Sequence, residues 1–249
     1  MQLFNDDCLK VLPNLAGESV DLIITSPPYQ DMRAAGYNRK TQDVLFLKLY
    51  SEFFEKIFKE YYRILKPNGQ LFFNIKSKTI DKTLLTPHWF EFLDGFQKLD
   101  FKSYIIWKYA GSFDSTKSRF HLDYEIIYHL SKGHQIYLNT NSDMHDPLSS
   151  VWYIPHNIPK NEKVHPTQMP IAVVDRILDT CSKKGDVILD NFLGSGTTGV
   201  ACKKRNLDFI GIEINPNNFE LAKKRIYESH NTVHTKKATS LYTWQARET

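Results

Sequence analysis

The sequence lacks the features of a membrane-bound or a secreted protein. No apolar run long enough to cross a bilayer occurs in it. The N-terminal segment Met1–Asp7 has neither the basic flank nor the apolar core of a signal peptide. We therefore expect no contact with a membrane and a cytoplasmic location.

Cysteine is scarce, and Cys8, Cys181 and Cys202 are odd in number and far apart. This spacing excludes a Cys-x-x-Cys zinc or redox pair and disfavours a disulfide framework, so we interpret all three as small apolar fillers. The nine histidines include no pair with the spacing typical of metal ligands. The sequence therefore predicts no metal site.

An excess of charge of one sign is also missing. The net charge is +4 and the pI about 8.7, which favours a polyanionic partner only weakly, because many solvated surfaces are as basic. A length of 249 residues with 41% hydrophobic and 13% aromatic content suffices for one large α/β core with a small appended region.

Strand and helix patterns alternate along most of the chain, as is typical of an α/β fold. The loop Gln30–Asp43 has almost no apolar periodicity, and we interpret it as a mobile lid. From Val44 to Leu65 apolar residues recur at three- and four-residue steps, which predicts a long helix whose aromatic stripe belongs to the core. Strands are further expected at Met1–Phe4, Asp21–Ser26, Gln70–Ile75, Ser103–Trp107, Glu125–Leu130, Val187–Asp190 and Phe209–Ile214, and helices after Asp6, near Trp89–Leu99, from Ile171, up to about Arg205 and over Asn217–Ser229.

The alternation breaks between Ser131 and Val164, where Asn, Ser, Asp, His and Pro dominate. We expect residues 131–164 to form an inserted region outside the main sheet, and the polar residues 230–249 to form a tail. Residues 1–130 and 165–229 are then the two halves of one domain.

A buried strand ends on the polar, stiff and aromatic segment Ser26–Tyr29. Pro27 and Pro28 fix φ and lack backbone donors, so the carbonyls of Ser26 and Pro27 stay available as acceptors. A hydroxyl, a carbonyl and the ring of Tyr29 suit the exocyclic amino group of a planar base, which needs two acceptors for its protons and a surface for stacking.

A second motif begins with Asp190, at the end of a strand, and continues in the glycine turn Gly194–Gly199, which opens a helix. Such a turn brings the backbone close to a ligand, and this one lacks the lysine of a phosphate-binding loop. Glu213 ends the next strand, where a carboxylate can accept both hydroxyls of a ribose. The motif predicts a site for a nucleoside-type cofactor; the alternative is a plain tight turn with a surface glutamate.

The order of the two motifs is unusual, because the glycine turn lies near the C-terminus and the Pro-Pro segment near the N-terminus. The chain is therefore predicted to be circularly permuted, with its two ends close in space. In this order, and in the tetrapeptide Ser26-Pro27-Pro28-Tyr29, residues 1–229 resemble the beta class of DNA amino-methyltransferases. The resemblance implies a doubly wound, Rossmann-like methyltransferase fold with a mostly parallel, seven-stranded sheet, in which residues 131–164 are the target-recognition region.

Other segments resemble the same family one at a time. Arg63–Gly69 is similar to its helix-to-strand signature, and the stretch up to Glu125 is similar to the one after its sixth strand. Val151–Pro155 and His165–Gln168 resemble the segment that folds over the cofactor. Met169 departs from the family, which commonly has a lysine at this place.

The resemblance implies S-adenosyl-L-methionine as cofactor and double-stranded DNA as partner. Asp7 matches a position near the cofactor adenine, although a charge at a helix N-terminus explains it equally well. The implied catalytic residues are Ser26, Pro27, Pro28 and Tyr29, and the implied cofactor-binding residues are Asp7, Thr25, His165, Pro166, Thr167, Asp190, Phe192, Gly194, Ser195, Gly196, Thr197 and Glu213. Basic residues in loops that leave the carboxyl ends of strands are the candidates for binding DNA phosphates: Arg33, Arg39, Lys40, Lys117 and Arg119.

The resemblance further implies site-specific methylation of a flipped-out cytosine at N4, because members with Ser at the position of Ser26 mostly modify cytosine and those with Asp mostly modify adenine. It places the protein in a prokaryotic cytoplasm or nucleoid, in a restriction-modification system, and allows a homodimer and a restriction endonuclease that acts separately. Adenine N6 is the first alternative target. RNA or protein amide methylation is a second, in which the glycine turn precedes the tetrapeptide, and a catalytically silent nucleic-acid-binding module is a third.

Overall fold

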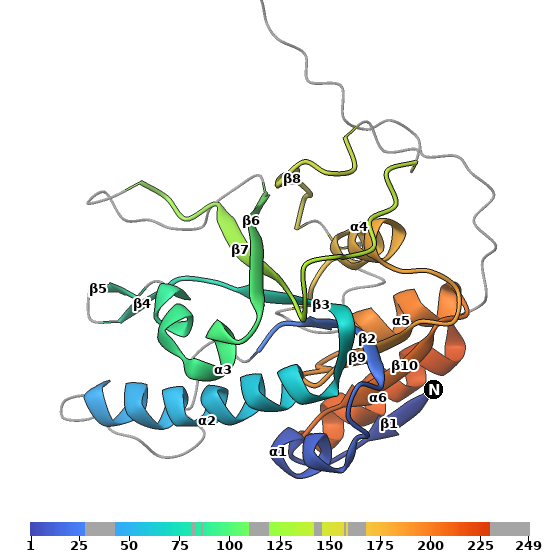
Figure 1. Ribbon diagram of the computed structural model, residues 1–249, viewed down its shortest axis with the longest axis horizontal. Helices are drawn as coiled ribbons and strands as arrows, with labels where there is room; N and C mark the ends of the chain where they lie inside the picture. Colours follow the sequence, from blue (N-terminus) through green and yellow to red (C-terminus); the bar gives the residue numbers. More distant parts are fainter. Residues whose placement is uncertain are drawn as a thin grey trace, which may run out of the picture.

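An eight-stranded sheet runs through the middle of the molecule (Figure 1). The computed structural model describes residues 1–27, 43–80, 83–85, 87–109, 120–141, 146–156, 158 and 168–229. In their order across the sheet, the strands are β1 (Gln2–Phe4), β10 (Asp208–Ile212), β9 (Val187–Asp190), β2 (Val20–Thr25), β3 (Leu65–Ile75), β7 (Tyr124–Ser131), β6 (Asp100–Lys108) and β8 (Val151–Tyr153). A separate hairpin consists of β4 (Lys78–Ile80) and β5 (Thr83–Leu85).

The strand order confirms the predicted permutation. If β9 is counted as the first strand and the count continues from β10 to β1, the order across the sheet is third, second, first, fourth and fifth. Beyond these lie β7, which is antiparallel to both of its neighbours, and β6. All pairs from β1 to β3 are parallel, which is the doubly wound arrangement. The N-terminal amine of Met1 lies 3.7 Å from the carboxylate of Asp208, at the start of β10, so the N-terminus lies beside the half of the sheet built by the C-terminal part of the chain.

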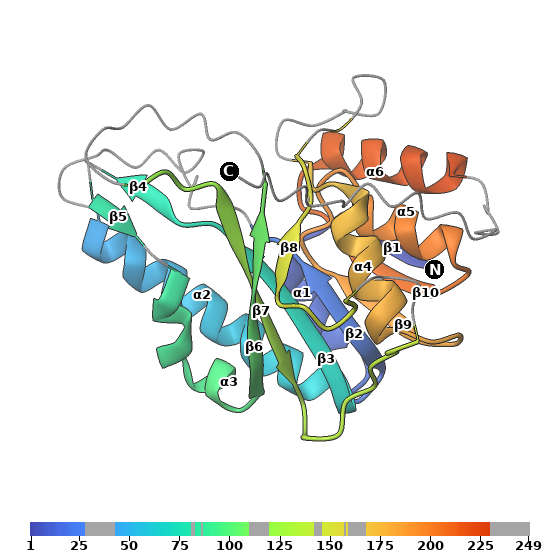
Figure 2. The same ribbon diagram turned by 90° about the horizontal axis from the view of Figure 1, so that it is seen from above.

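Helices cover both faces of the sheet (Figure 2). One face carries α1 (Cys8–Val11), α2 (Asp43–Ile64) and α3 (Asp94–Gln97), and the other carries α4 (Ile171–Cys181), α5 (Thr197–Lys204) and α6 (Pro216–Glu228). Short 3-10 helices lie at Leu12–Asn14 and Pro87–Phe92. The strands alternate between the two faces as a pleated sheet requires: Ile23 packs with the first group, and Leu22 and Ile24 pack with the second.

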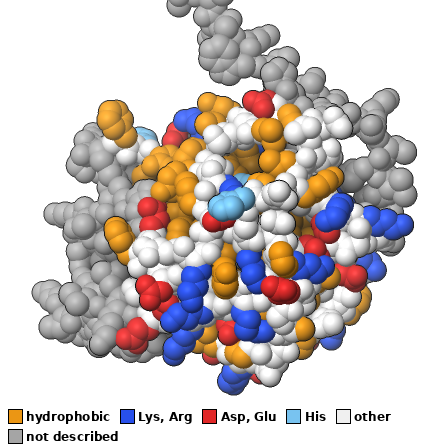
Figure 3. All heavy atoms as spheres, viewed as in Figure 1, with side chains coloured by type: hydrophobic (Ala, Val, Ile, Leu, Met, Phe, Trp, Pro, Cys, Tyr) orange, Lys and Arg blue, Asp and Glu red, His pale blue; other side chains and the backbone are white. Residues whose placement is uncertain are grey.

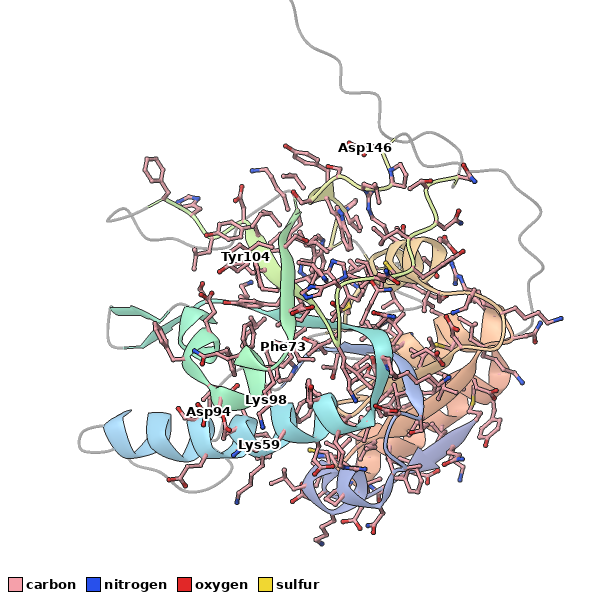
Figure 4. All side chains as sticks on the ribbon, viewed as in Figure 1. Lys59, Phe73, Asp94, Lys98, Tyr104 and Asp146 are labelled. Atoms are coloured by element: carbon pink, nitrogen blue, oxygen red, sulfur yellow. The ribbon has the colours of Figure 1, made fainter. Side chains whose placement is uncertain are left out.

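The aromatic stripe of α2 is core, as predicted. Phe54, Phe58 and Tyr61 are fully buried, and Phe54 meets Phe73 of β3 edge to face, with ring centroids 5.7 Å apart. Such aromatic pairs contribute about 0.5–1.5 kcal/mol each beyond their buried area. Figure 4 shows Phe73 between the sheet and α2, whereas the exposed side chains of Lys59, Asp94 and Lys98 lie where α2 and α3 approach each other.

Three features differ from the expectations. The sheet has eight strands and not seven, because β8 pairs in parallel with β6, so the inserted region is not wholly outside the main sheet. The strand predicted at Gln70–Ile75 begins earlier, at Leu65 in β3; its pairing with β2 jumps from Leu65 to Gln70, and Asn68 takes a φ of 65°. The hairpin of β4 and β5 was not anticipated, since its strands are too short for a periodic signal.

The interpretation of the cysteines as apolar fillers is confirmed. Cys8, Cys181 and Cys202 are buried free thiols, and burial raises the pKa of Cys8 and of Cys181 to about 12. Within the part of the chain that the structure describes, no helix is both long and apolar enough to cross a bilayer. On the face shown in Figure 3, basic and acidic side chains are interspersed over the lower part, and hydrophobic side chains gather in the upper part. This face therefore carries no patch of a single charge sign.

Candidate active site

A cavity of about 700 Å³ lies at the carboxyl ends of β2, β3, β9 and β10. It contains the boundary between β9 and β2, where the connections of a doubly wound sheet turn in opposite directions and where such folds bind ligands. Residues of the glycine turn, Glu213 and Ser26 all line it. The fold therefore brings the two motifs of the sequence, which are separated by most of the chain, into one cavity.

Asp190 ends β9 and is only 5% exposed. Its carboxylate accepts hydrogen bonds from the hydroxyls of Thr25 (2.9 Å) and Thr198 (2.7 Å) and from the backbone N–H of Phe192 (3.1 Å). Burial raises the pKa of Asp190 to about 6, against the opposite effect of these hydrogen bonds. Asp190 thus fastens the end of β2, the turn after β9 and the start of α5 to one another.

The glycine turn after Asp190 depends on glycine for two reasons. Gly194 and Gly196 have φ of 53° and 83°, in the left-handed region. A Cβ on Gly196 would also come within 2.9 Å of Ala222 on α6, whereas a Cβ on Gly194 would meet nothing closer than 3.8 Å. Gly196 therefore serves packing, and Gly194 leaves open space in the cavity for a ligand to approach the backbone.

Glu213, one residue beyond β10, is 9% exposed and lines the cavity. Its carboxylate accepts the backbone N–H groups of Gly194 (2.7 Å) and Asn215 (2.9 Å), one on each oxygen. Each carboxylate oxygen has a second lone pair that can accept from a ligand. Glu213 thus keeps acceptor capacity for the predicted contact with a ribose, and it has a further task that the sequence did not reveal, which is to hold the glycine turn.

Asp7 lines the same end of the cavity and also caps α1, since its carboxylate accepts the N–H of Leu9 at 2.9 Å. The alternative role of Asp7, a charge at a helix N-terminus, is therefore present. The rings of Phe53 and Phe192 lie nearby with centroids 6.2 Å apart and form apolar walls. Carboxylates for hydroxyl groups, an open backbone turn and flat apolar walls together fit a nucleoside.

Ser26 follows β2 directly and lines the part of the cavity at β2, β3 and β7, which we call the target end; Asp190 and Glu213 follow β9 and β10, at the cofactor end. Asn74 lies near the end of the neighbouring strand β3, and its amide Nδ2 is 3.4 Å from Ser26 Oγ and 3.0 Å from a carboxylate oxygen of Glu125. Lys76 and His156 approach the other oxygen of Glu125 at 3.8 and 3.6 Å. Ser26 is therefore the first member of a row of polar side chains along this wall.

This row was mostly missed by sequence reasoning, which noted Glu125 only as part of a family stretch. Asn74, Lys76 and His156 carry no motif, and they meet because β2, β3 and β8 end, and β7 begins, at the same edge of the sheet. A signal for two of them existed: Asn74 and Lys76 are polar residues at alternate positions where an apolar strand ends.

Several predicted site residues lie outside the described residues. These are Pro28 and Tyr29 of the tetrapeptide, the cofactor candidates His165, Pro166 and Thr167, the proposed lid, and the DNA-binding candidates Arg33, Arg39, Lys40, Lys117 and Arg119. The remaining predicted residues, namely Asp7, Thr25, Ser26, Pro27, Asp190, Phe192, Gly194, Ser195, Thr197 and Glu213, line the cavity, and Gly196 lies in the turn between them. Met169, where the family commonly has lysine, lines it as well and accepts the hydroxyl of Thr197 through its backbone carbonyl at 3.2 Å.

No cluster of His, Cys, Asp or Glu that could hold a metal ion occurs among the residues that the structure describes. His129 stacks on Phe72 at 4.4 Å and lies 2.9 Å from Gln70, and burial lowers its pKa to about 4. It is a neutral core side chain.

Comparison with known proteins shows which family this chain resembles. The family model for N6/N4 DNA methylases matches residues 20–224. The type II methyltransferase M.HpaI of Haemophilus parainfluenzae is 33% identical over 92% of this chain and 75% of its own length, and M.BglII of Bacillus subtilis is 28% identical over 89% and 67%.

Solved structures agree in fold. The PvuII DNA methyltransferase, which is cytosine-N4-specific, superimposes with a TM-score of 0.75 at 18% identity and covers 90% of this chain and 85% of its own. The Thermus thermophilus protein TTHA0409, in complex with S-adenosyl-L-methionine, gives 0.72 at 22% identity and covers 92% and 93%. The match of the family model over most of the chain, together with the shared cavity of the two motifs, shows that the chain belongs to the N6/N4 DNA methylase family, the S-adenosyl-L-methionine-dependent DNA methyltransferases.

Proposed function

We propose that this chain transfers a methyl group from S-adenosyl-L-methionine to the exocyclic N4 of a flipped-out cytosine at a specific site in double-stranded DNA. The observation that carries the proposal is that Ser26, Asp190 and Glu213 line one cavity, where they follow the neighbouring strands β2, β9 and β10. A methyl donor held at the cofactor end and an acceptor base held at the target end would meet inside it.

The cofactor would occupy the end formed by the glycine turn. Glu213 would accept the ribose hydroxyls, Asp7 would bind near the adenine, and Phe192 would pack on the ring. When bound there, the cofactor supplies a sulfonium-activated methyl group. The acidic side chains at this end also favour its positive charge.

At the other end, Ser26 Oγ and the Pro27 carbonyl accept the two protons of the amino group. The lone pair of that nitrogen is delocalised into the ring, which makes it a poor nucleophile. Holding both protons out of the ring plane favours a tetrahedral nitrogen whose lone pair points at the methyl group. Positioning of this kind accounts for roughly 7–11 kcal/mol of barrier lowering in well-oriented reactions.

Cytosine is favoured over adenine for two reasons. Ser26 is the residue that members of the resembling class mostly use for cytosine, and the solved PvuII enzyme, which shares the fold, is cytosine-N4-specific. Adenine N6 is the second candidate, since a serine hydroxyl can accept an amino proton from either base.

The DNA partner follows from the chemistry. A base inside a duplex is inaccessible to a buried cavity, so the target leaves the stack, which costs a few kcal/mol, and stacking on Tyr29 offsets this. Residues 131–164 are proposed to read the recognition sequence. A homodimer, and a restriction endonuclease that acts separately, stay part of the proposal.

Mass spectrometry of nucleosides tests the proposal. DNA from a methylation-free host that expresses the protein should contain N4-methylcytosine, and DNA from a host expressing Ser26→Ala should contain less by orders of magnitude. N6-methyladenine without N4-methylcytosine would overturn the choice of base, and no methylated base from the unaltered protein would overturn the activity.

A further inference from the structure

Beside Ser26, the cavity wall carries a polar row that the proposed methyl transfer does not use. It consists of Asn74, Lys76, Glu125 and His156, and all four line the cavity. The row begins at Ser26 Oγ, which lies 3.4 Å from the amide of Asn74. A base whose amino group is held at Ser26 therefore has its neighbouring ring atoms beside this row.

The geometry of the sheet sets the order of the row. Thr25 pairs with Phe73 in the parallel strands β2 and β3, so Ser26 and Asn74 lie in register one residue further. Lys76 comes two residues after Asn74, on the same side of the extended chain and roughly 6.6 Å further out. That displacement is comparable with the width of a pyrimidine with its exocyclic atoms.

Lys76 is held in place by neighbours from two other strands. Ile75 pairs with Ile126 in β7, which puts Glu125 opposite Lys76, and the two side chains lie 3.8 Å apart. The ammonium also donates to the hydroxyl of Tyr109, at the end of β6, at 2.8 Å. Burial opposes the charge of Lys76, but the Tyr109 hydroxyl and the Glu125 carboxylate outweigh it and raise its pKa. Lys76 is therefore a fixed cation at neutral pH.

The side chain of Glu125 is only 6% exposed, and a carboxylate buried to this extent needs partners for its charge. Asn74 donates to one of its oxygens, and Lys76 and His156 face the other. His156 in turn packs on Trp107, with ring centroids 4.6 Å apart. This support holds Lys76 at the cavity wall, and its side chain, which lines the cavity, is still 38% exposed.

Among the described residues that line the cavity, Lys76 is the one lysine or arginine. Cytosine and adenine both present an amino group, and they differ in the next atoms along the same edge. Cytosine continues with ring N3 and the carbonyl O2, whereas adenine continues with ring N1 and a C–H. A cation two residues beyond the position of the amino group distinguishes the two, because it can donate to a carbonyl oxygen that adenine lacks.

We propose that Lys76 is a specificity-determining residue that donates to O2 of the flipped cytosine while Ser26 accepts from N4. This inference rests on the proposed function, since it needs cytosine as the target. Glu125 and Tyr109 are positioning residues, because they act by holding the Lys76 ammonium.

The test replaces the O2 atom of the target cytosine with sulfur. The recognition site is first identified by sequencing methylated DNA from expressing cells. Duplexes are then made with cytosine or with 2-thiocytosine at the target, since sulfur at this position is a poor acceptor. Single-turnover methylation is measured for the unaltered protein, for Lys76→Met and for the control Lys66→Met, whose ammonium pairs with Asp21 at 2.7 Å outside the cavity.

The unaltered protein and Lys66→Met should methylate 2-thiocytosine roughly ten- to hundredfold more slowly than cytosine, as expected for a lost hydrogen bond to a charged donor. Lys76→Met should be slower on cytosine by a similar factor and should not distinguish the two bases. Its affinity for S-adenosyl-L-methionine, measured by calorimetry, should be unchanged because the cofactor residues lie at the other end.

Equal rates of the unaltered protein on both bases would overturn the inference, and this result does not depend on any variant folding. So would equal sensitivity to sulfur in Lys76→Met and the unaltered protein, which would make Lys76 a phosphate contact or a structural residue. Failure of the proposed function is seen separately, as N6-methyladenine formed by the unaltered protein.

Discussion

The two ends of the cavity are built differently. At the cofactor end the acids are already engaged by the protein at short distances: Asp190 accepts three hydrogen bonds of 2.7–3.1 Å, and Glu213 accepts two backbone N–H groups. At the target end side chains contact one another: Lys76 donates to Tyr109 at 2.8 Å and Asn74 to Glu125 at 3.0 Å, while Asn74 lies 3.4 Å from Ser26 and Lys76 3.8 Å from Glu125. The acids of the cofactor end thus hold backbone N–H groups, including one of the glycine turn, whereas these contacts of the target end join side chains.

The comparison predicts that changes at the cofactor end damage folding and cofactor binding together, whereas changes at the target end impair turnover alone. Variants at both ends test this, beginning with the largest expected effect.

Gly196→Ala should be the most damaging change. A left-handed φ of 83° costs an L residue roughly 1–2 kcal/mol, and the contact of its Cβ with Ala222 at 2.9 Å adds overpacking of about 1–3 kcal/mol. We expect the free energy of unfolding in urea to fall by about 2–4 kcal/mol.

Gly185→Ala is the matched control for Gly196→Ala. It has a φ of 92° but no atom within 4 Å of a built Cβ, so it should show the backbone cost alone. Equal destabilisation by the two variants would show that the packing of α5 on α6 does not require the glycine.

The raised pKa of Asp190 predicts that the stability of the protein depends on pH. Its pKa is about 6 in the folded protein, above the ordinary 3.8, so the folded state binds the proton more tightly and stability declines as pH rises through this window. We expect the free energy of unfolding to fall by up to about 1.4 kcal/mol per pH unit between about pH 4 and 6, relative to Asp190→Asn. Parallel stability curves for the two proteins would contradict the raised pKa.

Glu213→Gln should weaken cofactor binding roughly ten- to hundredfold in calorimetric titration, because hydrogen bonds to a charged group are worth about 1.5–3 kcal/mol. Glu213→Ala should also loosen the glycine turn and lower the melting temperature. Asp208→Asn is the control, since it changes an exposed acid on the same strand. Unchanged affinity in both Glu213 variants would remove the ribose assignment.

Tyr29→Ala tests the target end. It should slow methylation of duplex DNA and leave cofactor affinity nearly intact, because a stacking ring contributes roughly 1–3 kcal/mol per base. Tyr29→Phe should be mild. Equal rates for Tyr29→Ala and the unaltered protein would exclude Tyr29 as the stacking surface, and a loss of cofactor affinity would contradict the separation of the two ends.

The sequence by itself determined the parts that depend on neighbours along the chain. The stripe of α2, the strand before Asp190, the turn through Gly196 and the order of the two motifs were predictable, because helix periodicity, glycine conformation and proline stiffness act over a few residues. These features sufficed to predict the doubly wound class, the permutation and a nucleoside-type cofactor. The resemblance of the same motifs to a known family indicated the family.

Tertiary structure alone decided the rest. The membership of β8 in the sheet depends on its pairing with β6 far along the chain, and the second task of Glu213 depends on the distance from β10 to the glycine turn. The wall beside Ser26 brings together Asn74, Glu125 and His156, which carry no common motif. Their contacts arise because strands distant in sequence end at one edge of a sheet, and no local preference of the chain records which side chains meet there.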